Sequence, residues 1–135
     1  MRIAVVSAPP ERKAPPEYVK ALAKGMESMG HYVDVLDAWT GDGYRLPGYE
    51  YIAVVTQPRS AFTGKIPDVV SSVLSAASSL VGKKSGAFVM KSGLFTAKAL
   101  ANVMRAMEKE GMTVNWSDIL LNPAHAEAMG KRIGA

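Results

Sequence analysis

Short, uninterrupted apolar runs alternate along this chain with longer segments whose apolar residues return at helical spacing. The runs occupy residues 3–6 (IAVV), 51–55 (YIAVV) and 87–90 (AFVM). A strand that is apolar on both sides must be buried on both sides, and a parallel sheet covered by helices provides that environment. The alternation therefore restricts the chain to an α/β fold with helices on both faces of a parallel sheet.

Two further strand candidates alternate between apolar and polar residues. They lie at residues 33–36 (VDVL) and 112–116 (MTVNW). Alternation is typical of a strand with one wetter face or of a strand at the edge of a sheet. We therefore predict five strands, with these two at the edges.

Helices are predicted in four segments between and after the strands. The first follows Pro16 and the second opens at Pro67. The third stops near Gly111, and the fourth starts with Asn122 as its cap. The apolar faces of the first three consist of Tyr18, Leu22, Met26 and Met29, then Val70, Val73, Leu74 and Ala77, then Leu100, Val103, Met104 and Met107. Residues 37–50 are rich in glycine, which predicts a long loop or a short irregular turn.

The expected order of elements is strand, helix, strand, loop, strand, helix, strand, helix, strand, helix. With right-handed crossovers and the alternating strands at the edges, the sheet takes the order 2-1-3-4-5. The predicted architecture is a three-layer, doubly wound, five-stranded parallel sheet of the flavodoxin-like type. A length of 135 residues fits one such domain over residues 1–135.

The composition limits where the protein works and what it binds. No apolar run approaches the roughly 20 residues that cross a bilayer, so we expect no membrane contact. The chain has no cysteine, which fits a reducing interior and a periplasm equally, and we expect a cytoplasmic protein. Its 16 Lys and Arg against 12 Asp and Glu give a net charge of +4. No basic run is interleaved with aromatic residues, so a nucleic-acid partner is the least favoured.

In an open sheet of this order, ligands bind beyond the carboxyl ends of the strands, where the connections diverge. Three loops, at residues 7–15, 56–66 and 91–96, build this edge, which we call the mouth. Glu11 is the one acid in these loops, and their basic residues include Arg12, Lys13, Arg59, Lys65 and Lys91. A positive mouth beside helix N-termini favours a small anionic ligand or an acidic protein partner, although solvated loop charges explain the same pattern.

Three segments carry a resemblance to a known family. Residues 1–37 form a strand, loop, helix and Gly-His strand entry of characteristic lengths, Gly64-Lys65-Ile66-Pro67 follows the third strand, and Lys91-Ser92-Gly93 follows the fourth. Across nearly its whole length the chain resembles the flavodoxin-like superfamily, which includes small flavodoxins and flavin reductases. The resemblance implies a non-covalently bound FMN that carries electrons.

The loop after the first strand departs from the family pattern. In the family, Ser, Thr, Gly and Asn residues of this loop wrap the FMN phosphate through hydroxyls and backbone N–H groups. Here residues 7–16 read SAPPERKAPP, with four prolines that lack an N–H, no glycine, and Ser7 as the one hydroxyl. The negative charge of Glu11 would repel a phosphate in this loop. We therefore expect no cofactor at an ordinary phosphate loop, although Arg12 and Lys13 could hold a phosphate through their side chains.

Two aromatic side chains keep FMN open as the alternative cofactor. Phe62 lies in the second loop and Phe95 in the third, near the place where the family holds the flavin ring. Aromatic faces stack on planar heterocycles, but packing of these rings against loop backbone is the simpler explanation. The predicted anion or FMN site consists of Ser7, Arg12, Lys13, Arg59, Phe62, Lys91, Ser92, Gly93 and Phe95.

Residues for other reactions of this fold are missing. Ser7 and Thr56 stand where a phospho-receiver domain needs carboxylates. The chain has no glycine-rich dinucleotide turn and no Walker loop. His31 and His125 are predicted on different elements, so neither has a catalytic partner. We name no catalytic residue and no metal site.

Three functions follow, in order of preference. The first is a non-enzymatic binding or interaction domain without ordinary FMN binding. The second is an FMN-dependent electron-transfer protein or flavin-type oxidoreductase with an atypical phosphate site. The third is a polyanion-binding domain, which only the charge supports.

Overall fold

The computed structural model describes residues 1–133 and contains a five-stranded parallel sheet. The strands are β1 (Arg2–Ala8), β2 (Tyr32–Asp37), β3 (Tyr51–Thr56), β4 (Lys84–Met90) and β5 (Thr113–Leu120). Their order is β2-β1-β3-β4-β5, and all neighbours pair in parallel. The predicted α/β class, strand order and edge strands are confirmed.

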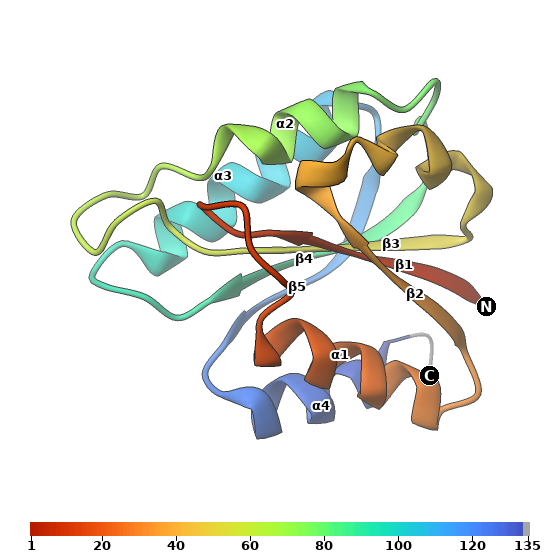
Figure 1. Ribbon diagram of the computed structural model, residues 1–135, viewed down its shortest axis with the longest axis horizontal. Coiled ribbons are helices and arrows are strands. Elements are labelled where there is room, and N and C mark those ends of the chain that lie inside the picture. The colour runs from red at the N-terminus through yellow and green to blue at the C-terminus, as the bar shows by residue number, and fades with distance from the viewer. Residues whose placement is uncertain (134–135) are drawn as a thin grey trace.

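Helices cover both faces of the sheet and form the outer layers (Figure 1). One face carries α1 (Glu17–Ser28) and α4 (Pro123–Arg132). The other carries α2 (Asp68–Ser75), α3 (Thr96–Lys109) and two short 3₁₀ segments, η1 (Ala38–Thr40) and η2 (Asp42–Gly48). The connection that we predicted as a loop or irregular turn forms these two 3₁₀ segments. A proline and several glycines disfavour a longer α-helix there. No helix within residues 1–133 is long and apolar enough to cross a membrane.

The apolar strand residues are divided between two cores, one on each face. Ile3 and Phe88 pack with side chains of α1 and α4, whereas Val6 and Val89 pack with side chains of α2 and α3. Successive strand side chains point to opposite faces, so a strand without polar residues serves both cores. Burial on both faces leaves the strand ends and their loops as the places for exposed polar chemistry.

Helices α1 and α4 pack backbone against backbone through two glycines. A Cβ on Gly25 would overlap the backbone carbonyl of Glu127, and a Cβ on Gly130 would overlap the carbonyl of Leu22. Both positions therefore require glycine. This close packing holds α1, and with it the end of the loop that follows β1, against the second helix of its layer.

The structure changes some predicted element boundaries. β5 continues four residues past Trp116, because polar Ser117 and Asp118 are tolerated on an edge strand. Pro16 and Pro67 are the capping residues before α1 and α2 rather than their first helical residues. The prediction that Asn122 caps α4 is confirmed by its side chain, which accepts a backbone N–H of the first turn at 2.8 Å.

Candidate functional site

The carboxyl ends of β1, β3 and β4 meet at one edge of the sheet, at the left in Figure 1. Parallel strands in one sheet place all their carboxyl ends together. The connections leave this edge at residues 9–16, 57–67 and 91–95. The predicted site residues therefore all lie at the mouth, in these connections or, for Ser7, at the end of β1.

The connection after β1 is fixed in place by Trp39 of η1. Trp39 Nε1 donates to the Pro9 carbonyl at 3.0 Å, and Arg12 Nη2 donates to the Trp39 carbonyl at 3.2 Å. Trp39 is itself positioned by Asp37, whose Oδ1 accepts the Trp39 backbone N–H at 2.9 Å. The proline-rich loop is thus held by an indole from a different connection, and the sequence pattern of the loop did not indicate this.

Ser7 carries a buried hydroxyl without a hydrogen-bond partner. The residue is 1% exposed, and its Oγ is the one such buried side-chain atom among residues 1–133. Leaving a buried hydroxyl unpaired costs about 1–3 kcal/mol, and such groups are uncommon in native proteins. Because protein atoms cover this hydroxyl, a ligand oxygen could become its partner only after the loop that follows β1 moves.

The connections after β3 and β4 are bonded to each other. Leu94 donates its backbone N–H to the Ala61 carbonyl at 3.2 Å. Gly93, with φ +70°, lies so close to Ala61 that a Cβ would overlap its backbone. The backbone N–H of Ser92 donates to Thr96 Oγ1 at 3.1 Å, within the turn that begins α3. Ser92 and Gly93 thus help to shape the loop.

The connection after β3 is also closed on itself and held by α3. Its two ends are joined by a hydrogen bond from the Arg59 N–H to the Lys65 carbonyl at 2.9 Å. Asn102 Nδ2 of α3 donates to the Gly64 carbonyl at 2.8 Å. The first turn of α3 packs there too, since a Cβ on Gly64 would meet the side-chain stem of Lys98. These contacts make the two loops one unit.

Phe62 and Phe95 are exposed at the mouth. Phe62 is 83% exposed and Phe95 is 42% exposed, beside Leu94 at 82%. The simpler explanation, in which both rings pack against loop backbone, is therefore wrong for Phe62. Aromatic and apolar surface stands free where a planar ligand or another molecule can reach it.

The cations of the mouth are exposed and lack acidic partners. Within residues 1–133, no ion pair includes any of the five basic residues of the predicted mouth, Arg12, Lys13, Arg59, Lys65 and Lys91. Arg12 uses one N–H on the Trp39 carbonyl. Its other donors, and those of Lys13, are available to an anion.

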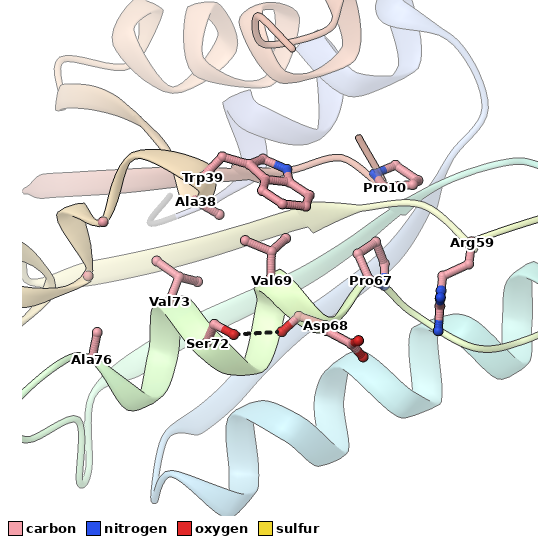
Figure 2. A pocket seen from close by; sticks show the side chains of 12 residues that line it. Pro10, Ala38, Trp39, Arg59, Pro67, Asp68, Val69, Ser72, Val73 and Ala76 are labelled. Atoms are coloured by element: carbon pink, nitrogen blue, oxygen red, sulfur yellow. Dashed lines mark hydrogen bonds between the residues drawn. The ribbon is translucent and has the colours of Figure 1, made fainter. Parts of the chain in front are cut away.

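A cavity of about 550 Å³ opens beside the mouth, between Trp39 and the start of α2 (Figure 2). Its lining includes Pro10, Trp39, Arg59, Pro67, Asp68 and Ser72. Volume and mixed lining are typical of small-ligand sites. Of the predicted set only Arg59 lines this cavity. Sequence reasoning missed the others because they come from three separate segments that only folding brings together.

A second cavity, of about 410 Å³, lies between the loop after β4 and the start of α4. It is lined by Lys91 and Gly93 of the predicted set, together with Asp118 and His125. His125 Nε2 lies 3.9 Å from Asp118 Oδ2. Arg59 and Lys91 thus line two different cavities, and the predicted residues share an edge of the sheet rather than one enclosed pocket.

The two histidines lie apart, in local contacts. His31 Nδ1 is 3.1 Å from the amino nitrogen of Met1, and His125 Nδ1 accepts the Leu121 N–H at 3.2 Å. Across residues 1–133, no group of three or more His, Asp or Glu side chains is arranged to hold a metal ion.

No protein-family model and no curated protein matches this sequence. Solved structures do match it. A flavodoxin from the domain Archaea covers 98% of this chain and 96% of its own, with TM-score 0.71 and 22% identity. Oxidised flavodoxin 2 from Bacillus cereus covers 96% and 94%, with TM-score 0.71 and 13% identity. The diflavin flavoprotein A3 from Nostoc sp. covers 96% and 88%, with TM-score 0.58 and 16% identity. The protein has the flavodoxin-like fold.

These likenesses correct the expectation that the protein works without a cofactor. Chains that share the fold over nearly the full length of both partners are flavodoxins, and one is named a flavoprotein. The proline-rich loop was the reason for excluding a flavin. The other connections at the mouth bring cations and aromatic rings to the same edge, so this one loop does not decide cofactor binding.

Several side chains at the mouth could hold an FMN phosphate and ring. Ser7 Oγ has no partner, and Arg12 and Lys13 are exposed with donors free. Phe62 and Phe95 supply aromatic surface. The backbone contributes little, because the four prolines of the loop after β1 have no N–H.

Proposed function

We propose that this protein is an FMN-binding electron carrier of the flavodoxin type, with the phosphate held by side-chain cations. The observation that supports the proposal is the match in fold between nearly the whole chain and flavodoxins. The expectation of a binding domain without FMN gives way to the alternative that the sequence analysis kept open.

The chain's own residues have distinct parts in this proposal. Arg12 and Lys13 would bind the phosphate, with Ser7 Oγ as a neutral donor. Phe62 and Phe95 would contact the flavin ring by stacking. When bound, FMN supplies the reversible uptake of electrons, and the protein supplies binding, orientation and charge. Trp39 positions the loop that carries Arg12 through the bonds described above.

A phosphate site made of charged side chains differs from one made of backbone N–H groups in its response to salt. A cradle of neutral N–H groups is close-fitting and little affected by salt, whereas exposed cations are screened as ionic strength rises. We therefore expect FMN affinity to fall with added salt.

The test is a titration of the apoprotein with FMN and with riboflavin, which lacks the phosphate, followed by flavin fluorescence. We expect FMN to bind with micromolar or tighter affinity and riboflavin to bind at least about tenfold more weakly. Salt should weaken the binding of FMN and leave that of riboflavin nearly unchanged. A protein that leaves the fluorescence of both flavins unchanged would contradict the proposal.

A charge variant tests the assignment of the phosphate site. Arg12→Ala with Lys13→Ala should weaken FMN binding by about tenfold or more and leave riboflavin binding unchanged. The matched control is Lys20→Ala with Lys131→Ala, which removes the same charge from exposed positions on α1 and α4. Equal losses of FMN affinity in both variants would show that net charge, rather than this site, attracts FMN.

Other expectations stay predictions. A flavin-type oxidoreductase shares the same FMN site and differs in having a substrate, which turnover assays with reduced nicotinamide nucleotides would reveal. Polyanion binding is checked by retention on heparin at low ionic strength. The cytoplasmic location rests on the sequence alone.

A further inference from the structure

The loops after β3 and β4 reach farthest from the sheet at the mouth (Figure 1). We call residues 57–67 and 91–98 the basic tip. This segment pair contains four basic residues, Arg59, Lys65, Lys91 and Lys98, and no Asp or Glu. All four are exposed, and none is in an ion pair within residues 1–133. The basic tip is therefore a local concentration of positive charge, although Asp68 lines a cavity with Arg59 and Lys65, and Asp118 lines one with Lys91.

Large apolar side chains lie among these cations. Phe62 is 83% exposed and Leu94 is 82% exposed, and the hydrogen bond from Leu94 to the carbonyl of Ala61 ties the two side chains' loops together. Phe95 adds a third, partly exposed ring. Single exposed apolar residues are ordinary on protein surfaces, but a cluster among charges is typical of an interaction site. Phe62 and Phe95 are also assigned to the flavin ring, so Leu94 is the member of this cluster that is assigned to the partner alone.

The cluster is held rigidly. The bond between Arg59 and Lys65 closes the first loop, and Asn102 anchors it to α3. Gly93 lies against Ala61 without room for a side chain. Phe62 and Leu94 are thus presented on backbone that is already ordered, so a partner that binds them loses little conformational entropy of this chain.

We propose that the basic tip is the docking surface for a redox protein with an acidic face. The inference rests on the proposed function, because a carrier of electrons must meet a partner near the mouth. An apolar centre with a charged rim is the usual anatomy of a transient protein interface. Complementary charge raises the rate of encounter and orients the partner, and four unpaired cations select an acidic surface.

The shape of the cluster favours a protein over a membrane or a nucleic acid. Peripheral membrane binding usually uses an amphipathic helix with a long apolar face, whereas the basic tip offers three apolar side chains on loops. Lys98 lies against Gly64, the residue next to Lys65, so these charges are clustered rather than arranged in the extended stripe that tracks a phosphate backbone. An acidic protein matches both the apolar centre and the rim.

The test uses a small acidic [2Fe–2S] ferredoxin as the probe, titrated by calorimetry against the apoprotein and the FMN-loaded protein at low ionic strength. We expect binding that weakens as salt is added. Lys65→Glu with Lys98→Glu should weaken ferredoxin binding by about tenfold or more, Lys65→Glu alone by less, and Leu94→Ser by about threefold to tenfold. FMN affinity of each variant is measured separately, because the reversed charges lie at the mouth, and far-UV circular dichroism shows that the variants are folded.

Two matched controls isolate the surface. Lys20→Glu with Lys131→Glu changes the net charge equally on the layer of α1 and α4, and Val81→Ser removes an apolar side chain that is 80% exposed before β4. Both controls should bind ferredoxin like the parent protein. Losses equal to those of the tip variants would overturn the proposal in favour of a net-charge effect.

The remaining outcomes are also decisive. Absence of ferredoxin binding at low ionic strength overturns the docking surface while leaving FMN binding, which is measured separately. If ferredoxin binding depends on the basic tip but no FMN binds, the docking surface is supported and the proposed electron-carrier function is wrong. Tighter, Leu94-dependent binding to vesicles of phosphatidylglycerol, or tip-dependent binding to duplex DNA in place of ferredoxin, would assign the basic tip to a membrane or to a nucleic acid instead.

Discussion

The hydroxyl of Ser7 links stability to ligand binding at a single atom. It is buried at the end of β1 with no partner, so it lowers the stability of the free protein. The same hydroxyl lies where flavodoxin-like folds receive their ligand, at the carboxyl end of the first strand. A buried polar group that is unpaired in the free protein and becomes paired when a ligand binds is typical of a binding site.

Ser7→Ala should therefore have opposite effects on stability and on binding. We expect the free energy of unfolding of the apoprotein to stay equal or to rise by up to about 1 kcal/mol, since an unpaired buried hydroxyl is removed. FMN affinity should fall by about threefold to tenfold, the value of one hydrogen bond. Urea denaturation and FMN titration measure the two quantities. A clear loss of apoprotein stability would show that Ser7 has a partner in the free protein.

Tyr51 gives the stability of the protein a dependence on alkaline pH. Its hydroxyl donates to Asn115 Oδ1 at 2.9 Å, and burial raises its pKa well above the ordinary value of 10.0. Because the folded state holds this proton more tightly than the unfolded state, the stabilisation is complete below the unfolded pKa. It is lost as the pH rises above that value. The pKa of Tyr49 is also raised, by burial and then by its bond to Asp34, and acts in the same direction.

Tyr51→Phe should flatten this pH dependence. We expect the urea midpoint of the parent protein to fall steeply between about pH 9.5 and pH 11, and that of the variant to fall less, with the remainder due to Tyr49. The variant also loses the bond to Asn115 and should be less stable near neutral pH by about 1 kcal/mol. Parallel curves for the two proteins would contradict the assignment to Tyr51.

Among the elements, α1 and α4 pack closely enough to tolerate little change at their contact. Gly25 and Gly130 let the two backbones approach until a single methyl group would overlap a carbonyl of the other helix. Helix propensity favours alanine over glycine at interior positions. The two glycines are therefore explained by packing between helices and oppose the local preference of each helix.

Gly25→Ala and Gly130→Ala should each lower the free energy of unfolding by about 1–3 kcal/mol, because the helices must move apart. Gly48→Ala is the matched control, since no atom lies within 4 Å of the Cβ position there, and its effect should stay within about 0.5 kcal/mol. Chemical denaturation of the three variants measures this. Similar stabilities for all three would mean that α1 and α4 adjust their spacing freely.

The elements also show how far local patterns reach. Runs without polar residues predicted β1, β3 and β4, because burial on both faces leaves no polar position in a strand. The end of β5 was placed too early, since Ser117 and Asp118 on an edge strand resemble a loop. Residues 37–50 were expected to be irregular, and the two 3₁₀ segments agree with this. Their key contact, Trp39 with Pro9, was not foreseen because it joins residues far apart in the chain.

For the molecule as a whole, the proposed FMN binding would be linked to folding. A ligand that binds only the folded protein adds stability that grows with its concentration, by about 2.7 kcal/mol at one hundred times the dissociation constant. Thermal denaturation should therefore show a melting temperature that rises with FMN. The rise should be smaller at high salt and smaller with riboflavin at the same concentration. Equal shifts with both flavins would show that the phosphate contributes nothing.

The pattern of apolar runs and helical spacing was enough to predict the fold class, the strand order and the edge where the loops gather. A strand that is buried on both faces consists of consecutive apolar residues, which are visible in the sequence. The carboxyl ends of parallel strands must also lie at one edge of the sheet. Which loop backbones meet was not predictable in this way. The bonds from Leu94 to Ala61 and from Trp39 to Pro9, the exposure of Phe62 and the cavity beside α2 all depend on groups that are distant in the chain. Only packing of the whole domain brings such groups into contact. Local periodicity and composition contain no information about which distant backbone carbonyl a given N–H will bond.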